Sequence, residues 1–402
     1  MQLAKNDSPI TMICLIPNIG STSFKYRVLK MPEEKVLANG RVERIGQPGG
    51  DCPDYPSAIR KCIDDVVGPG KALKSLSEIE AVGFKAVHAG PISGPCLIDD
   101  ELLAAMADFA FFAPAHNPPY IAAMKAFRDA LPGVPLVAVF ETIPYASLDE
   151  AATTYAVPYE WRTEFGIRRY GFHGASHRAA SENVRKQFNK PGLRHISCHL
   201  GGSSSIAAFR DGVAIDTSFG TSPQSGLPQN NRVGDIDAFA VLYMMKKLGV
   251  GPDEMAGILG SQSGLAGISG TSGDMRDLDE AAAAGSKRAR LALDVYVRAI
   301  RRYLGAFILE LDGVDVISFS GGIGENSPET RTAVCKNLAA FEIEIDEAVN
   351  RTARTAQVIS SKTSAVTLLI VPADEESVVA RDTVSVVERG AAKRAESIEA
   401  VR

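Results

Sequence analysis

The segment 168–177, RRYGFHGASH, concentrates side chains that can bind an anion. It holds two arginines, two histidines and two glycines, although the chain has only six histidines in all. The glycines beside His173 remove side-chain bulk, so a backbone or a ligand can come close. Cations on such a turn suit a phosphate or a carboxylate. Two alternatives stay open on this segment alone: a solvated basic loop, and a zinc site formed by His173 and His177, which lacks a third ligand nearby.

Turns rich in glycine and serine follow three apolar runs, and they favour phosphate binding. The segments 11–29 and 195–209 each have the pattern of strand, turn and strand, so we expect hairpins whose backbone amides and hydroxyls can cradle phosphate. An ordinary polar hairpin turn explains the first of them equally well. In 314–327 a strand leads into a glycine-rich turn and then a helix that begins near Pro328, which is typical of nucleotide binding.

The remaining elements must position these turns. A buried strand over 134–140 places Glu141 at its carboxyl end, where open α/β sheets carry their chemistry, although a helix cap or a surface carboxylate is the alternative for this residue. We expect further strands at 81–88 and 365–371, and a long loop at 261–277. We expect helices at 57–67, 76–80, 99–112, 120–130, from within 168–177 to about 189, at 238–248, at 278–311 with a break near residue 285, and after 376.

Length and composition bound the class of protein. A chain of 402 residues is too long for one ordinary core, so we expect two domains. The formal charge of −5, with both signs mixed along the chain, gives no support to binding of nucleic acid or of a membrane. Six cysteines without C-x-x-C spacing predict free thiols in a reducing compartment. Because neither a signal peptide nor a long apolar run is present, we expect a cytoplasmic protein.

A series of motifs along nearly the whole chain resembles the acetate kinase family. The motifs, in order, are NIGSTSFK (18–25), AHNPP (115–119), VAVFET (137–142), RRYGFHGASH (168–177), CHLGG (198–202), RVGDID (232–237), GDMRD (273–277), GGIGENS (321–327) and DEE (374–376). The combination of RRYGFHGASH, CHLG and GGIGEN is highly specific for that family.

The resemblance implies an α/β fold of two actin-like (ribonuclease H-like) βββαβαβα domains around an ATP cleft. It implies an N-terminal domain of residues 1–143 with the returning C-terminal helix 379–402, and a nucleotide-binding domain of residues 144–378. It further implies a homodimer that uses ATP/ADP with Mg²⁺ or Mn²⁺ and reversibly transfers the γ-phosphoryl group to a short-chain carboxylate.

The resemblance also assigns roles to residues of this chain. The catalytic set that it implies is Glu141, His173, His199 and Arg232. The carboxylate-binding set is Lys85, Val87, Ala115, Phe172 and Pro223. The nucleotide-binding set is Ser21, Ser23, Lys25, His199, Gly201, Gly202, Asp274, Met275, Arg276, Gly322, Ile323, Gly324 and Asn326. The metal site is assigned to Asn18 and Glu375, with Glu376 as the alternative to Glu375.

Several residues depart from the family pattern. Lys85 stands where the family has arginine, Glu141 stands where it has the catalytic aspartate, Gly202 replaces an asparagine, and the loop 89–94 lacks the usual charged residues. Ala115 stands where a leucine is usual, so we expect room for an acid larger than acetate, such as propionate. The alternatives are a kinase for another acid or an alcohol on the same scaffold, and a nucleotide-binding homologue that has lost catalysis.

Overall fold

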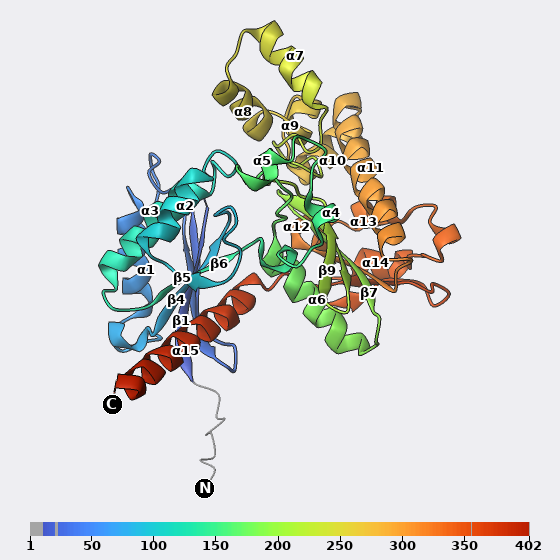
Figure 1. The fold of residues 1–402 in the computed structure, drawn as a ribbon. Helices are drawn as coiled ribbons and strands as arrows, with labels where there is room; N and C mark the ends of the chain where they lie inside the picture. Colours follow the sequence, from blue (N-terminus) through green and yellow to red (C-terminus); the bar gives the residue numbers. More distant parts are fainter. Residues whose placement is uncertain (1–10, 21–22, 355, 402) are drawn as a thin grey trace. The chain divides into compact units, whose positions relative to one another are not determined.

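The computed structural model describes residues 11–20, 23–354 and 356–401, with side chains described as far as residue 390. The chain forms two compact units, and each is α/β (Figure 1). The first unit comprises the chain up to Ile143 together with the segment from Asp374 onward, and the second comprises Pro144–Ala373. The C-terminal segment therefore belongs to the first unit from Asp374 onward. The resemblance had implied a return at residue 379.

The first unit is built on a mixed six-stranded sheet with the order β3-β2-β1-β4-β6-β5. β1, β2 and β3 form an antiparallel meander, β4 and β6 continue the sheet in parallel to β1, and the short edge strand β5 is antiparallel to β6. The central strands read as continuous apolar runs because they are buried on both faces. The bounds are β1 (Met12–Ile19), β2 (Phe24–Met31), β3 (Lys35–Val42), β4 (Ala81–Ala86), β5 (Cys96–Leu97) and β6 (Leu136–Phe140).

Helices α1 (Tyr55–Val66), α2 (Asp100–Asp108), α3 (Asn117–Ala130) and α15 (Glu375–Val401) complete the first unit. The helix α15 packs against β1, β2, β4 and β6, although it comes from the far end of the chain. At Gly83 an added Cβ would lie only 2.1 Å from Oγ1 of Thr383 on α15. The glycine thus allows the helix to approach the sheet closely.

The second unit repeats the topology of the first. Its sheet has the order β11-β12-β10-β7-β8-β9, again with an antiparallel meander, two strands parallel to its first member and a short antiparallel edge. Two sheets of this kind confirm the expected α/β class and are consistent with two actin-like domains. The strands are β7 (Arg194–Leu200), β8 (Ser204–Arg210), β9 (Val213–Thr217), β10 (Val316–Ser320), β11 (Gln357–Val358) and β12 (Thr367–Ile370).

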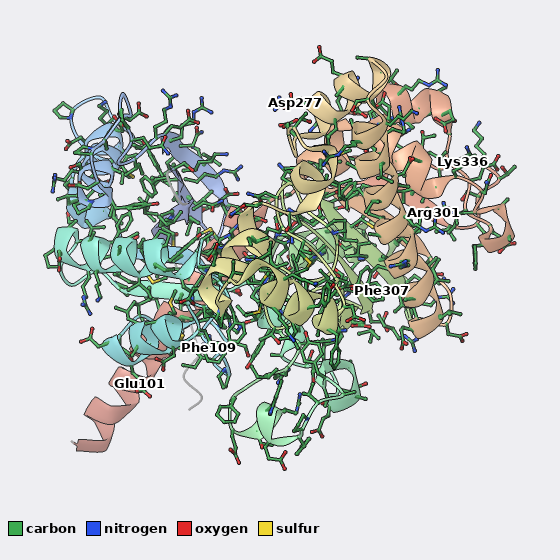
Figure 2. The ribbon with its side chains drawn as sticks, turned by 90° about the horizontal axis from the view of Figure 1, so that it is seen from above. Glu101, Phe109, Asp277, Arg301, Phe307 and Lys336 are labelled. Atoms are coloured by element: carbon green, nitrogen blue, oxygen red, sulfur yellow. The ribbon has the colours of Figure 1, made fainter. Side chains whose placement is uncertain are left out.

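Two helices cover the two faces of this second sheet. Successive residues of a strand point to opposite faces. Val316 of β10 packs in a cluster with Ala180 and Val184 of α6 (Gly174–Phe188), whereas its neighbour Ile317 belongs to the main core around α11 (Lys287–Glu310). Arg301 of α11 donates hydrogen bonds to the carbonyl oxygens of Val334 (2.7 Å) and Lys336 (2.6 Å), and Figure 2 labels the side chains of Arg301, Phe307 and Lys336 in this unit.

The other helices of the second unit lie in its connections. They are α4 (Glu150–Thr153), α5 (Glu160–Thr163), α7 (Ala238–Leu248), α8 (Pro252–Ser261), α9 (Gly264–Ser269), α10 (Met275–Ala283), α12 (Gly321–Asn326), α13 (Pro328–Cys335) and α14 (Glu347–Thr352). Two expectations need correction. The expected loop 261–277 contains α9, and the expected glycine-rich turn 321–327 is the helix α12. The expected break near residue 285 is confirmed: Gly285 has φ 95°, and Ser286 then caps α11.

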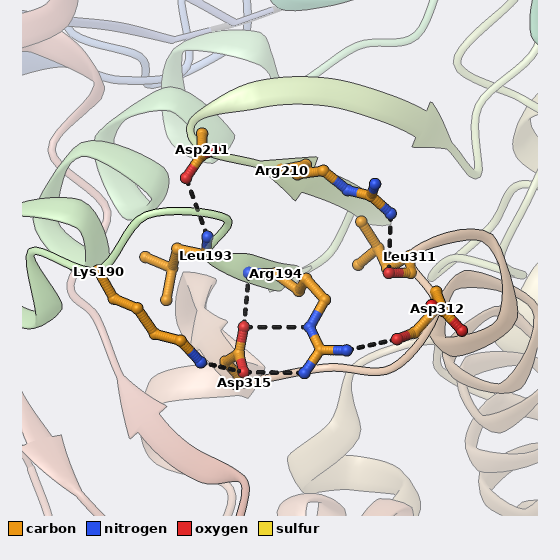
Figure 3. A network of polar contacts seen from close by, with 8 residues as sticks. All are labelled: Lys190, Leu193, Arg194, Arg210, Asp211, Leu311, Asp312 and Asp315. Carbon is orange, nitrogen blue, oxygen red and sulfur yellow. Dashed lines mark hydrogen bonds and ion pairs between the residues drawn. The ribbon is translucent and has the colours of Figure 1, made fainter.

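A polar network fixes the amino ends of β7 and β10 (Figure 3). The carboxylate of Asp315 accepts hydrogen bonds from the backbone amide (2.8 Å) and the guanidinium of Arg194 and from Lys190 (2.8 Å). Burial alone would raise the pKa of Asp315, but these hydrogen bonds outweigh it and hold the pKa well below its ordinary value. Because the network is at the amino ends, the carboxyl ends of the same strands stay available for a site.

Candidate active site

The carboxyl ends of β7 and β10 border a pocket of about 580 Å³ in the second unit. The two strands are parallel, and His199 lies in register with Ser320 at this edge. The pocket is lined by Gly201, Gly202, Asn230, Asp274, Met275, Arg276, Asp279, Gly322, Ile323, Asn326, Ser327 and Glu329. The structure therefore brings together eight residues that the sequence assigned to the nucleotide. Two other members of that set in the second unit do not line the pocket: Gly324 is buried against the end of β10, and His199 lies on β7.

A buried arginine holds the glycine-rich wall of this pocket in helical form. Nη1 of Arg331, which is fully buried, donates to the carbonyl oxygens of Gly324 (2.8 Å) and Glu325 (3.0 Å). These are carbonyls at the end of α12, which the helix cannot satisfy itself. Asn350 accepts two further hydrogen bonds from the same guanidinium. Sequence reasoning did not select Arg331. One of its partners, Asn350, is distant in the chain, and the others belong to α12, whose glycines make a helix unexpected.

Asp274 and Arg276 form a second wall at the start of α10. The Asp274 side chain caps the helix by accepting a hydrogen bond from the backbone amide of Arg276 (2.9 Å), and it also binds the Arg276 guanidinium at 2.7 Å and 3.0 Å. Hydrogen bonds from Arg276 lower the pKa of Asp274 to about 2. Asp274 therefore stays ionised at neutral pH, and the exposed Arg276 is held beside the pocket.

The rings of His173, His177 and His199 lie close together at the start of α6. His173 has a left-handed backbone (φ 56°) and immediately precedes the helix. Its ring centroid lies 4.3 Å from that of His199, and its Nδ1 lies 2.8 Å from Oγ of Ser205. Nδ1 of His199 lies 2.7 Å from Oγ of Ser176. In the described part of the chain no group of three metal-ligating side chains is assembled, so the zinc alternative receives no support.

The segment before His173 depends on a glycine. Gly171 has φ 72°, and a Cβ at this position would lie 2.3 Å from the ring of Tyr145. The hydroxyl of that tyrosine donates a hydrogen bond to the carbonyl oxygen of Phe172 (3.1 Å), and the Phe172 ring packs edge-on against Phe219. The turn that presents His173 is thus built on a packed aromatic base.

We predict that Gly171→Ala destabilises the protein more than Gly192→Ala does. Both glycines have positive φ (72° and 69°), so the left-handed backbone should cost about 1–2 kcal/mol in each variant. Only Gly171 also faces a ring, whereas nothing lies within 4 Å of a Cβ at Gly192. Urea unfolding of both variants measures the difference. Equal free energies of unfolding would contradict the role of the Tyr145 contact.

Arg232 lies on a loop that packs against the hairpin of β7 and β8, whose turn lines the pocket. Its Nη1 lies 3.3–3.5 Å from Oγ of Ser203, the carbonyl oxygen of Pro223 and Oε1 of Gln229, which are all uncharged. Gln229 is buried, and its Nε2 donates to the same Pro223 carbonyl (2.8 Å). Burial lowers the pKa of Arg232 below its ordinary value, but a guanidinium keeps its charge at neutral pH. A partly desolvated cation without a carboxylate in this set of contacts is suited to an anionic ligand.

The first unit holds a separate charged cluster at the carboxyl ends of β4 and β6. Lys85 forms an ion pair with Glu375 at the start of α15, and its Nζ lies 3.9 Å from Oε1 of Glu141. Burial alone would lower the pKa of Lys85, but the carboxylates of Glu375 and Glu141 outweigh it and raise the pKa above its ordinary value. Lys85 is therefore an ammonium ion at all physiological pH values, and it stabilises the buried carboxylate of Glu141 and the partly buried carboxylate of Glu375.

The other predicted residues of the first unit are less closely gathered. Asn18 is half-buried on β1, Ser23 precedes β2 and Lys25 is exposed on it, while Ser21 lies outside the described residues. Val87 is buried and Ala115 is exposed. Phe172 and Pro223, the other two residues assigned to the acyl group, are both buried in the second unit. Tyr120, which sequence reasoning did not select, accepts a hydrogen bond from the amide of Ile19 (3.2 Å) and influences the pKa of Lys85.

The fold, with two sheets of the same topology, is that of the actin/hexokinase-like class, and comparison with known proteins identifies the family. The profile of the acetokinase family matches residues 13–381. The acetate kinase of Thermosipho africanus (strain TCF52B) is 41% identical over 408 residues, which covers 95% of this chain and 99% of that protein. The chain belongs to the acetokinase family.

Solved structures agree with this assignment. The crystal structure of Porphyromonas gingivalis acetate kinase matches with a TM-score of 0.84 and 35% identity, covering 94% of this chain and 100% of that one. A propionate kinase from Francisella tularensis subsp. tularensis SCHU S4 matches with a TM-score of 0.85 and 29% identity, covering 93% of this chain and 100% of that one.

Proposed function

We propose that this protein is a phosphotransferase with a carboxyl group as acceptor, which phosphorylates a short-chain carboxylate with ATP to give an acyl phosphate, reversibly. One observation carries the proposal furthest. The pocket formed by the residues assigned to the nucleotide begins at Gly201, just beyond the end of β7 and two residues after His199 of that strand. A nucleotide bound in that pocket would place its phosphates near His173 and His199. The membership of the acetokinase family supports the same reaction.

The residues at the site fit this chemistry. A carboxylate is already ionised at neutral pH, so it attacks phosphorus without a general base. The barrier lies in bringing two anions together in line, and cations and hydrogen-bond donors lower it by stabilising the equatorial oxygens of the transferring group. We assign that role to Arg232, His173 and His199. The acidic Glu141 would orient the reactants, since no proton has to be removed.

The residues assigned to the metal suit Mg²⁺ in chemical type. Asn18 and Glu375 offer an amide and a carboxylate oxygen, which are the ligands that Mg²⁺ takes in proteins. When bound, Mg²⁺ would offset the negative charge of the β- and γ-phosphates. The carboxylate of Glu375 is bound to Lys85, so we propose that Lys85 keeps it ionised and oriented for the metal.

We predict the substrate preference from Ala115. If the smaller side chain enlarges the acyl site, kcat/KM for propionate should equal or exceed that for acetate, and Ala115→Leu should lower the ratio about tenfold, since one methylene is worth roughly 1–3 kcal/mol. The measurement is ADP release with formate, acetate, propionate and butyrate, and with ATP, GTP and pyrophosphate as phosphoryl donors. Trapping the product as a hydroxamate identifies an acyl phosphate. A clear preference for acetate or formate would refute the enlarged site, and nucleotide binding without turnover would refute the reaction.

We also propose that the protein is a homodimer, and the helix α7 supports this. It is rich in apolar residues, none of which is buried; Phe239 is 81% exposed, and Leu242 and Tyr243 are each 58% exposed. A monomer rarely presents such a face to water. We expect a two-chain mass in sedimentation equilibrium, which Phe239→Glu with Leu242→Glu should reduce to one chain. Leu309→Glu is the control, because Leu309 is 79% exposed but lies on α11, away from the apolar residues of α7 in the sequence. A wild-type mass of one chain would contradict the proposal.

We further propose a cytoplasmic location. All six cysteines are free thiols, and five of them are buried, as expected of a protein from a reducing compartment. Among the described residues, no helix combines the length and the apolar character that a membrane span needs.

A further inference from the structure

A chain of hydrogen bonds connects His173 to the core of the second unit. Oγ of Ser205 on β8 lies 2.8 Å from Nδ1 of His173 and 2.8 Å from Nε2 of His177. Nδ1 of His177 in turn lies 2.8 Å from Oγ of Ser197 on β7. Ser205, His177 and Ser197 are all fully buried, so water does not compete for these bonds. One hydroxyl therefore bridges a histidine of the site and a histidine that the proposed reaction does not use.

The number of protons available to His173, Ser205 and His177 limits how the hydrogen bonds between them can be arranged. Burial, with smaller contributions from His199 and His195, lowers the pKa of His177 well below its ordinary value, so the ring is neutral. A neutral imidazole has one donor nitrogen and one acceptor nitrogen, and a serine hydroxyl has one proton to donate. Two directions of the bond to His173 are therefore possible. In the first, Ser205 donates to Nδ1 of His173 and can only accept from Nε2 of His177. In the second, Nδ1 of His173 donates to Ser205, and the hydroxyl either donates to Nε2 of His177 or accepts a second bond from it.

The two directions differ in what His173 can offer a ligand. If Ser205 donates to Nδ1, the neutral ring carries its proton on Nε2 and can donate from there. In the reverse direction Nδ1 holds the proton, so Nε2 can donate only if the ring becomes an imidazolium. The titratable groups whose rings face His173 are His177 on α6 and His199 on β7, with centroids 6.4 Å and 4.3 Å away. An imidazolium at His173 would be repelled by any positive charge on these two neighbouring rings, so the neutral form of His173 is favoured.

We infer that His177 is a positioning residue, which acts through Ser205 to hold His173 as the neutral tautomer with its proton on Nε2. This inference rests on the proposed role of His173 as a donor to the transferring phosphoryl group. It means that His173 donates to the phosphoryl oxygens without being protonated, and that its orientation is set from within the core. His177 itself touches neither reactant.

The direct test is the nitrogen NMR spectrum of histidine-labelled protein without substrate. We expect the wild type to show His173 in the Nε2–H form at pH 8, and Ser205→Ala to show a new population of the Nδ1–H form. His177→Gln, whose amide reaches about the place of Nε2, should keep the wild-type form, whereas His177→Asn should not. The Nδ1–H form in the wild type, or an unchanged His173 spectrum in Ser205→Ala, would overturn the inference.

Kinetics provide the second readout. Ser205→Ala should lower kcat roughly tenfold, in line with the loss of one hydrogen bond, with KM values for ATP and the carboxylate unchanged. The control is Ser318→Ala, which removes a bond of equal length (2.8 Å) between two buried groups, Ser318 and His195, on the same sheet. It should change neither kcat nor the His173 spectrum, and a tenfold loss in this control would overturn the kinetic argument. Because the spectra need no substrate, they test the tautomer even if no carboxylate proves to be a substrate.

Discussion

Replacement of Arg232 by alanine is expected to lower kcat by roughly a hundredfold to a thousandfold while the fold stays intact, which is the typical cost of removing one group that stabilises transition-state charge. Arg232 is held by three uncharged oxygen atoms at 3.3–3.5 Å, so its positive charge has no carboxylate in that set to neutralise it. His173→Ala should have an effect of the same order. The measurements are steady-state kinetics of ADP release, with circular dichroism to verify folding.

Two further variants make this result specific. Arg232→Lys keeps the charge but loses the planar fork of donors, so it should recover only part of the rate. Arg301→Ala removes another arginine of the second unit that donates to two carbonyl oxygens, but those belong to Val334 and Lys336 and are not part of the pocket. It should retain the wild-type kcat. Wild-type turnover in both Arg232→Ala and His173→Ala would contradict the roles proposed for them.

Glu141→Asp is expected to lower kcat about a hundredfold, and adding Lys85→Arg is expected to restore most of the loss. Glu141 is one methylene longer than the usual aspartate, and displacement of a reacting group by about 1 Å can cost a hundredfold in rate. In the structure Nζ of Lys85 lies 3.9 Å from Oε1 of Glu141. A longer arginine would reach a shorter aspartate at a similar place, so the two departures from the family pattern should compensate each other.

A double-mutant cycle in kcat measures that compensation. The control cycle uses Lys30→Arg and Glu33→Asp, an exposed pair in the first unit whose Nζ and Oε1 lie 3.4 Å apart. Exposed pairs of this kind contribute little, so the control should show no coupling in the rate. If the effects of Lys85→Arg and Glu141→Asp are strictly additive, the two residues do not compensate each other.

Much of the fold was predictable because local patterns and tertiary packing agree. The strands at 81–86 and 136–140 are mostly apolar runs ended by polar or glycine-rich segments, and the helix 238–248 has the expected bounds. The helix α12 was not predictable from local pattern. Its sequence GGIGEN argues against a helix, and the buried Arg331 that satisfies its carbonyls is held by Asn350, which lies nineteen residues further along the chain.

The candidate site was predictable in its residue types and less so in its connections. Asp274, Arg276, Gly322 and Asn326 were assigned to the nucleotide by motif and line one pocket. Asn230, Asp279 and Glu329 line it as well, and no motif pointed to them. The hairpin of β7 and β8 was expected, but the burial of His177 between serine hydroxyls of these two strands depends on how α6 packs against them, which the sequence does not reveal.

The return of α15 to the first unit has a consequence for synthesis on the ribosome. Pro144–Ala373 is continuous, so the second unit can complete its sheet while the chain is still being made. The first unit must wait, because the surface of β4 and its neighbours is covered by α15, which is made after the second unit. During that interval Gly83 and the strand around it lack the helix that covers them. The sheet of the first unit is thus made before the second unit but reaches its native packing after it, and a nascent chain paused near residue 373 exposes that surface to chaperones.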